Sequence, residues 1–242
     1  RAAMSESVTG GRAVGAGQGW AWIADGFGLF KKAPGIWIAL VIVLLVILVV
    51  LAFIPLLGAV ATFLLLPAFT GGLMSGCRTL QGGGELELRH LFAGFDKAHA
   101  GNLILLGALA IGGWVIVMLP VIAIVGAGTL FALISGDAAG AAAMGGSFVL
   151  AWLVATALSI PIYMALWFAP ALVVLRGMTA VAAIKESFLG CLKNILPFLV
   201  YGIVLVVLGI VAAIPLGLGW LVLGPVVIAS VYVGYRDIFG DT

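Results

Sequence analysis

Six basic residues recur at matched places along the chain, and they are the best candidates for binding chemistry in the sequence. Three of them close short segments that resemble one another, "FGLFKK" (27–32), "FAGFDK" (92–97) and "FLGCLK" (188–193). An arginine follows the next apolar stretch each time, which completes the set Lys32, Lys97, Lys193, Arg78, Arg176 and Arg236. Basic groups at the cytoplasmic surface of a bilayer attract anionic lipid headgroups. The set therefore predicts an anionic-lipid headgroup site, and the alternative is that these charges only orient the chain in a membrane.

The composition indicates the medium around these residues. The chain has 242 residues, of which 64% are hydrophobic and 8% are charged, whereas a soluble domain has about 25% charged residues. The formal net charge of +2 is too small for a nucleic-acid-binding surface. We therefore predict an integral membrane protein with no nucleic-acid partner.

Long apolar runs predict membrane-spanning helices. A helix needs about 20 mainly apolar residues to cross the hydrocarbon core, and runs without alternation do not suit a membrane β-strand. We predict an all-α polytopic protein with one domain over 18–242 and a flexible tail over 1–17. A kink is expected in the fourth span, which contains Pro161 and Pro170. The predicted spans are 35–54, 56–77, 100–124, 147–175, 195–214 and 218–235.

The basic residues also predict the orientation. With six spans, all 11 Lys and Arg residues fall on the side that holds both termini, and the 126–146 connection on the other side carries only Asp137. Basic residues near span ends mark the cytoplasmic face. Both termini are therefore expected in the cytoplasm.

The lysine segments are part of a longer repeat. Pro55, Pro120 and Pro215 stand 23, 23 and 22 residues after the three lysines. This pattern predicts three parallel repeats, each an interfacial amphipathic helix followed by a helical hairpin, at about 18–80, 86–178 and 179–239. The expected apolar faces of these helices are Trp20, Ile23, Phe27 and Phe30, then Leu88, Leu91, Phe92 and Phe95, then Val181, Ile184, Phe188 and Cys191.

Small residues predict close helix contacts, either within the chain or against a partner. The pairs are Gly72 with Gly76 and Ser230 with Gly234, each four residues apart. Cys191 takes the place of Phe30 and Phe95 in the repeat, so it is expected as a buried contact.

Chemistry of other kinds is scarce. His90 and His99 are nine residues apart and do not share a helix face as a two-histidine metal pair would. No catalytic, cofactor or metal site is predicted, and no cofactor is expected.

The segments "GWAWIADGFGLFKKAPGIWI", "ELELRHLFAGF", "ALWFAPALVVLRG", "IPLGLG" and "YRDIF" resemble a family of proteobacterial multi-pass inner-membrane proteins. Their layout is similar to that of YciC-type proteins and of the membrane domain attached to some glycerophosphodiester phosphodiesterases. The resemblance implies a location in the bacterial inner membrane and a six-helix fold, and it implies no reaction.

Two classes of function remain. The first is a non-enzymatic accessory or organising subunit that binds a membrane partner, a second copy or anionic lipid through its interfacial helices. The alternative is a transporter or channel for a lipid or a small neutral solute. An enzyme that uses Glu85, Glu87 or His90 ranks third, because nothing pairs these groups.

Overall fold

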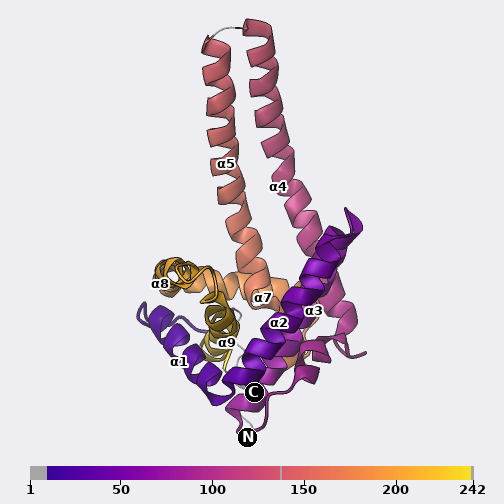
Figure 1. Cartoon of the computed structure of the whole chain (residues 1–242), viewed down its shortest axis with the longest axis vertical. Helices are drawn as coiled ribbons and strands as arrows, with labels where there is room; N and C mark the ends of the chain where they lie inside the picture. Colours follow the sequence, from indigo (N-terminus) through magenta and orange to yellow (C-terminus); the bar gives the residue numbers. More distant parts are fainter. Residues whose placement is uncertain (1–9, 137, 241–242) are drawn as a thin grey trace, which may run out of the picture. The chain divides into compact units, whose positions relative to one another are not determined.

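The computed structural model describes residues 10–136 and 138–240, and the regular elements of these residues are all helical (Figure 1). The all-α prediction is confirmed. In chain order the elements are α1 (Gln18–Lys32), α2 (Pro34–Ala52), α3 (Leu57–Gln81), the 3-10 helix η1 (Leu88–Phe95), α4 (Ala100–Ser135), α5 (Ala138–Trp167), α6 (Ala169–Arg176), α7 (Ala180–Lys193), α8 (Ile195–Ala213) and α9 (Trp220–Phe239).

Six helices of the described chain are long and apolar enough to cross a membrane, which confirms the predicted number of spans. They are α2, α3, α4, the combined α5 and α6, α8 and α9. The predicted 126–146 connection is wrong, because α4 continues to Ser135 and α5 begins at Ala138. The alanines of this stretch favour a helix, and the cost of each glycine, about 1 kcal/mol, is too small to interrupt it. Gly136 turns the chain with φ of 63°, and Asp137 lies outside the described residues.

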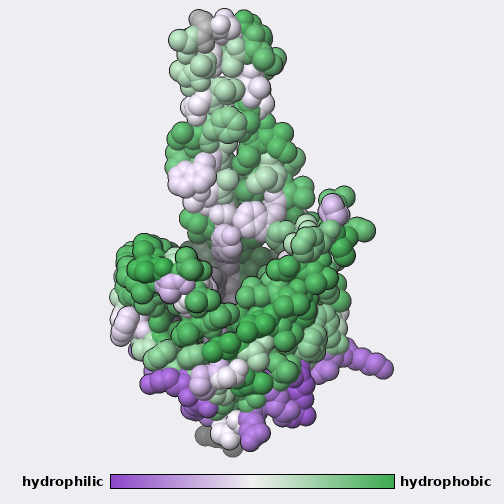
Figure 2. All heavy atoms as spheres, in the orientation of Figure 1, coloured by the Kyte–Doolittle hydropathy of each residue, from purple (hydrophilic) through white to green (hydrophobic). Residues whose placement is uncertain are grey.

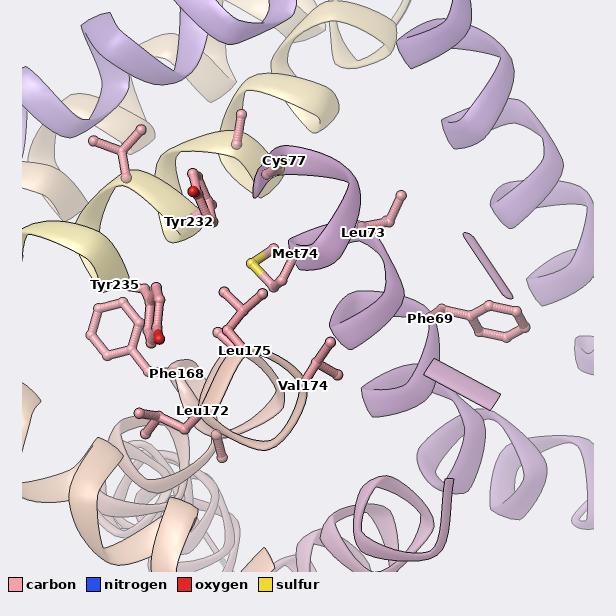
Figure 3. Packing of buried hydrophobic residues seen from close by; sticks show 14 of the residues in the cluster. Phe69, Leu73, Met74, Cys77, Phe168, Leu172, Val174, Leu175, Tyr232 and Tyr235 are labelled. Atoms are coloured by element: carbon pink, nitrogen blue, oxygen red, sulfur yellow. The ribbon is translucent and has the colours of Figure 1, made fainter. Parts of the chain in front are cut away.

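The described chain divides into two compact units, residues 10–107 with 164–240 and residues 108–163. In the first unit, α3, α6 and α9 meet in an apolar core (Figure 3). Each of these helices ends near one of the predicted arginines. In each helix, the residues four places and one place before the arginine are buried. These core residues are Met74 and Cys77, Leu172 and Leu175, and Tyr232 and Tyr235.

The short helices complete this core. The helix α1 packs on α9 and α8, η1 packs on α3, and α7 packs on α6. The predicted interfacial face of α1 is divided, because Ile23 is buried whereas Trp20 is 57% exposed. On the visible face of this unit, hydrophilic residues gather at one end and hydrophobic residues cover the rest (Figure 2).

The second unit is a helical hairpin made of most of α4 and most of α5. Its arms pack through small residues and one aromatic pair. A Cβ added to Gly128 would lie 2.2 Å from the Ser147 hydroxyl, and the rings of Trp114 and Tyr163 meet edge to face at 5.6 Å. Such close backbone approach is typical of helices that associate in lipid.

A glycine pair in α1 tests the α1–α9 contact. A Cβ at Gly26 would lie 2.8 Å from the Ser230 backbone nitrogen, whereas a Cβ at Gly28 would meet nothing within 4 Å. We expect Gly26→Ala to lower stability by about 1–3 kcal/mol through overpacking, and Gly28→Ala to raise it by about 0.5–1 kcal/mol through helix propensity. Thermal unfolding of both variants in the same detergent measures the difference, and equal midpoints would contradict this packing.

Candidate functional site

The predicted basic residues stand at the ends of helices. Lys32 ends α1, Arg176 ends α6 and Lys193 ends α7, while Arg78 and Arg236 stand in the last turns of α3 and α9. Lys97 follows η1. A cation near a helix C-terminus is stabilised by the helix dipole and can donate to the last carbonyls, which have no partner inside the helix. The positions therefore suit a structural role as well as a binding role.

Three of these side chains donate to such carbonyls on another helix. Arg78 Nη1 lies 3.4 Å from the Leu175 carbonyl oxygen at the end of α6. Arg176 donates to the carbonyl of Phe239 at the end of α9 and its guanidinium stacks over the Phe239 ring. Lys32 Nζ lies 3.4 Å from the carbonyl of Leu80 at the end of α3. The arginines thus link α3 to α6 and α6 to α9.

Two further lysines also contact groups of the chain. Lys193 Nζ donates to the carbonyl of Gly11 at 3.1 Å, and Lys31, the neighbour of Lys32, lies 5.2 Å from the ring centre of Phe27. Both contacts involve exposed cations near the surface. Ammonium groups in such positions can still meet a lipid phosphate.

The predicted small-residue pairs lie against other helices of the same chain. Gly72 and Gly76 face η1, and a Cβ would lie 2.4 Å from the His90 carbonyl oxygen at Gly72 and 3.1 Å from the His90 side chain at Gly76. The Ser230 hydroxyl lies 2.7 Å from the Tyr201 hydroxyl of α8. Gly234 lies against the ring of Trp22. These pairs pack the first unit internally.

One polar contact was missed from the sequence. The Ser187 hydroxyl of α7 accepts a hydrogen bond from the Phe168 backbone N–H at 3.0 Å and donates to the Met164 carbonyl at 2.7 Å. Phe168 and Met164 are four residues apart, so Ser187 takes the place of one helical hydrogen bond. This insertion divides α5 from α6 at Phe168, just before Pro170. Proline predicted the kink, but no local pattern predicted the partner.

Cys191 stands one turn after Ser187 on α7 and is buried. Its Sγ atom lies 3.5 Å from the Met164 carbonyl oxygen. Burial raises the pKa of Cys191 to about 12, and the hydrogen bond with Ser187 opposes this only in part. The thiol is neutral at physiological pH, which suits a packing role.

His90 has a structural role at the start of η1. His90 Nδ1 accepts from the Glu87 backbone N–H at 3.0 Å and so caps η1. Within residues 10–136 and 138–240, no group of three or more His, Cys, Asp or Glu side chains could hold a metal ion.

The segment before α1 is tied to α7 and α9. Arg12 pairs with the Asp237 carboxylate at 2.6 Å, and the same carboxylate accepts from the Trp22 indole at 3.0 Å. Asn194 accepts from the Val14 N–H at 2.8 Å. These bonds involve residues 10–17 of the predicted tail, and residues 1–9 lie outside the described part.

Together, the apolar helices, their close packing through small residues and the basic residues at helix ends define a polytopic helical membrane protein. A protein of Burkholderia thailandensis named as a probable inner membrane protein is 30% identical over 200 residues, which cover 78% of this chain and 73% of that protein. The chain belongs to the family of this inner membrane protein. No family model matches the chain, and no solved structure matches it. The likeness to YciC-type proteins stays a prediction.

The Ser187 contact can be tested through the thiol beside it. Because the neutral thiol of Cys191 is buried, a maleimide at pH 8 reacts with it only when α7 opens. In a Cys77→Ala background, Ser187→Ala removes the acceptor of the Phe168 N–H, which costs about 1–3 kcal/mol. The labelling rate of Cys191 should then rise roughly fivefold or more.

Ser75→Ala is the matched control, because the Ser75 hydroxyl donates to the Gly72 carbonyl of its own helix α3. Its labelling rate should stay within about twofold of the background, since the Ser75 hydroxyl joins no second helix and its loss leaves no backbone N–H without an acceptor. If Ser187→Ala behaved like this control, the Ser187 hydroxyl would not stabilise the packing of α7.

Proposed function

We propose that this inner-membrane protein is a non-enzymatic accessory or organising subunit that holds a membrane protein partner along its helical hairpin, residues 108–163. In this proposal its termini lie in the cytoplasm, which the distribution of basic residues favours. Anionic lipid is its second kind of partner. The length and apolar surface of the hairpin carry the proposal.

The hairpin is longer than a bilayer needs. Residues 108–135 and 138–163 each form an arm of about 40 Å at 1.5 Å per residue, against a hydrocarbon core of about 30 Å. The helix pairs α2 with α3 and α8 with α9 have 19 to 25 residues per helix, whereas α4 has 36 and α5 has 30. At 3.6 residues per turn, α4 is about three turns longer than α3, the longest of the other four helices, and α5 is about one turn longer than α3.

The surface of these arms is apolar along their length. Ile116, Ile122, Ile134 and Trp152 are each more than 60% exposed. Apolar side chains beyond the hydrocarbon core would face water unless another protein covers them. A partner protein with apolar helices would cover these side chains. The competing explanation is that the hairpin is tilted by about 40°, which would keep both arms within the lipid.

The arrangement as three parallel repeats is part of the proposal. The buried residues lie at the same distances before Arg78, Arg176 and Arg236. In addition, each short helix packs on the last helix of the preceding repeat, so that α1 packs on α9, η1 on α3 and α7 on α6. In both α3 and α9, the carbonyl ten residues before the arginine lies against a glycine of the short helix. These pairs are Ala68 with Gly94 and Val226 with Gly26. These correspondences support a triplicated unit.

The junction of the repeats favours an organising subunit over the alternative of a transporter. It is filled by the six buried residues of α3, α6 and α9 named above, four of which are aliphatic or sulfur-containing (Figure 3). A path for a solute between the repeats would require these side chains to separate.

The lysines support the anionic-lipid part, because Lys32 and Lys193 are exposed although each also donates to a backbone carbonyl. We expect Lys97→Glu combined with Lys193→Glu to reduce the anionic phospholipid that co-purifies, because each near-surface cation contributes about 1 kcal/mol to such binding. Lipid extraction and mass spectrometry measure the content. Unchanged content and stability would remove these lysines from the site.

The hairpin is tested by shortening it. Replacing residues 119–148 by residues 214–219 of the same chain gives the middle pair the length of α8 and α9. We expect native mass spectrometry from membranes to show the wild-type chain in a fixed ratio with one other membrane protein, and the shortened chain without it. Thermal unfolding shows whether the shortened chain is folded.

The matched control is Ile203→Ala with Val206→Ala on the exposed face of α8, which should leave the complex intact. A wild-type chain that carries only lipid would contradict the accessory role. An assembly of identical chains that is lost on shortening would replace the protein partner by a second copy. An impermeant maleimide should also reach Ala139→Cys from outside the cell if the termini are cytoplasmic.

A further inference from the structure

The first unit contains an apolar groove between α1, α8 and α9. Its volume is about 530 Å³, which is within the range of about 300–1,000 Å³ for sites that hold one ligand molecule. The lining includes Trp20, Ala24 and Phe27 of α1, Leu208 of α8 and Val222 of α9. All of the lining residues are apolar or aromatic.

The side chains at the rim show that the groove is open to the surroundings. Trp20 is 57% exposed, Phe27 is 43% exposed and Val222 is 39% exposed. Both α8 and α9 are candidate membrane spans, so the medium at this surface is hydrocarbon and not water. A ligand that enters from this medium must itself be mainly apolar.

A cation stands at the end of the same helix face. At 100° per residue, Trp20, Ile23, Ala24 and Phe27 form one stripe of α1, and Lys31 continues it. Lys31 Nζ lies over the ring of Phe27, which itself lines the groove. Asp25, the acidic residue of α1, stands more than 100° from the stripe, on the same side as Lys32.

We infer that this groove binds one acyl chain of an anionic phospholipid, with the phosphate of the lipid near Lys31. The apolar lining matches the chain, and the positive charge at the end of the stripe matches the headgroup. This site deepens the lipid-binding part of the proposed function. It does not depend on the hairpin or on a protein partner.

Photochemical labelling tests the site in the full chain. The protein is placed in phosphatidylcholine vesicles that carry a small fraction of phosphatidylglycerol with a photoreactive acyl chain, and the labelled peptides are identified. We expect labels concentrated in residues 20–27 and 208–226. Ala24→Trp fills the groove with an apolar ring and should reduce this labelling severalfold.

A second filling variant, Val222→Trp, reaches the groove from α9 and should have the same effect if Ala24→Trp alone disturbs α1. Val181→Trp on α7 is the control, since Val181 is 66% exposed and does not line the groove. Labels spread evenly over the exposed faces of α2 and α8, with no change in either filling variant, would overturn the site.

The headgroup is tested by charge reversal. Lys31→Glu should reduce labelling by phosphatidylglycerol about fivefold or more relative to photoreactive phosphatidylcholine. Lys185→Glu on α7 makes the same change in charge at an exposed position away from the groove and should leave the ratio unchanged. If the two lipids labelled the wild-type groove equally, the assignment to anionic lipid would be wrong.

Discussion

Backbone carbonyls at the ends of membrane helices need hydrogen-bond donors, and much of the first unit is arranged around this need. The last carbonyls of a helix have no partner within it, so a side chain or water must supply the donor. Arg78 and Arg176 donate to the ends of α6 and α9, and Lys32 donates to the end of α3. The same side chains that mark the polar end of the unit therefore also hold its helices together.

Close backbone contact follows from the same medium. Lipid chains are as apolar as leucine side chains, so burial in hydrocarbon does not drive helices together, and association depends on packing and hydrogen bonds. Gly26 lets α1 approach the backbone of α9. On α7, Ser187 inserts its hydroxyl into the backbone of the α5–α6 break. Both close contacts depend on a small side chain.

The sequence predicted those features that depend on hydropathy and on charge along the chain. The six spans and the placement of arginines and lysines at helix ends belong to this group, because a 20-residue apolar run or a terminal cation is a local property. The helical structure within residues 126–146 was missed, since a segment rich in both alanine and glycine is compatible with a helix or a loop. The acceptors of the arginines and the partner of Ser187 could not be predicted, because they join residues 19 to 97 positions apart.

The difference between the three hairpins bears on what each can do. The pairs α2–α3 and α8–α9 are made of helices that a bilayer can cover, and their exposed apolar residues need no further explanation. The pair in residues 108–163 shares their apolar surface but has longer arms, so lipid covers all of it only when it is strongly tilted. The arms of this hairpin contact each other at two places along their length, through Gly128 and Ser147 and through Trp114 and Tyr163. A partner could therefore bind along it without replacing the contacts that hold the first unit together.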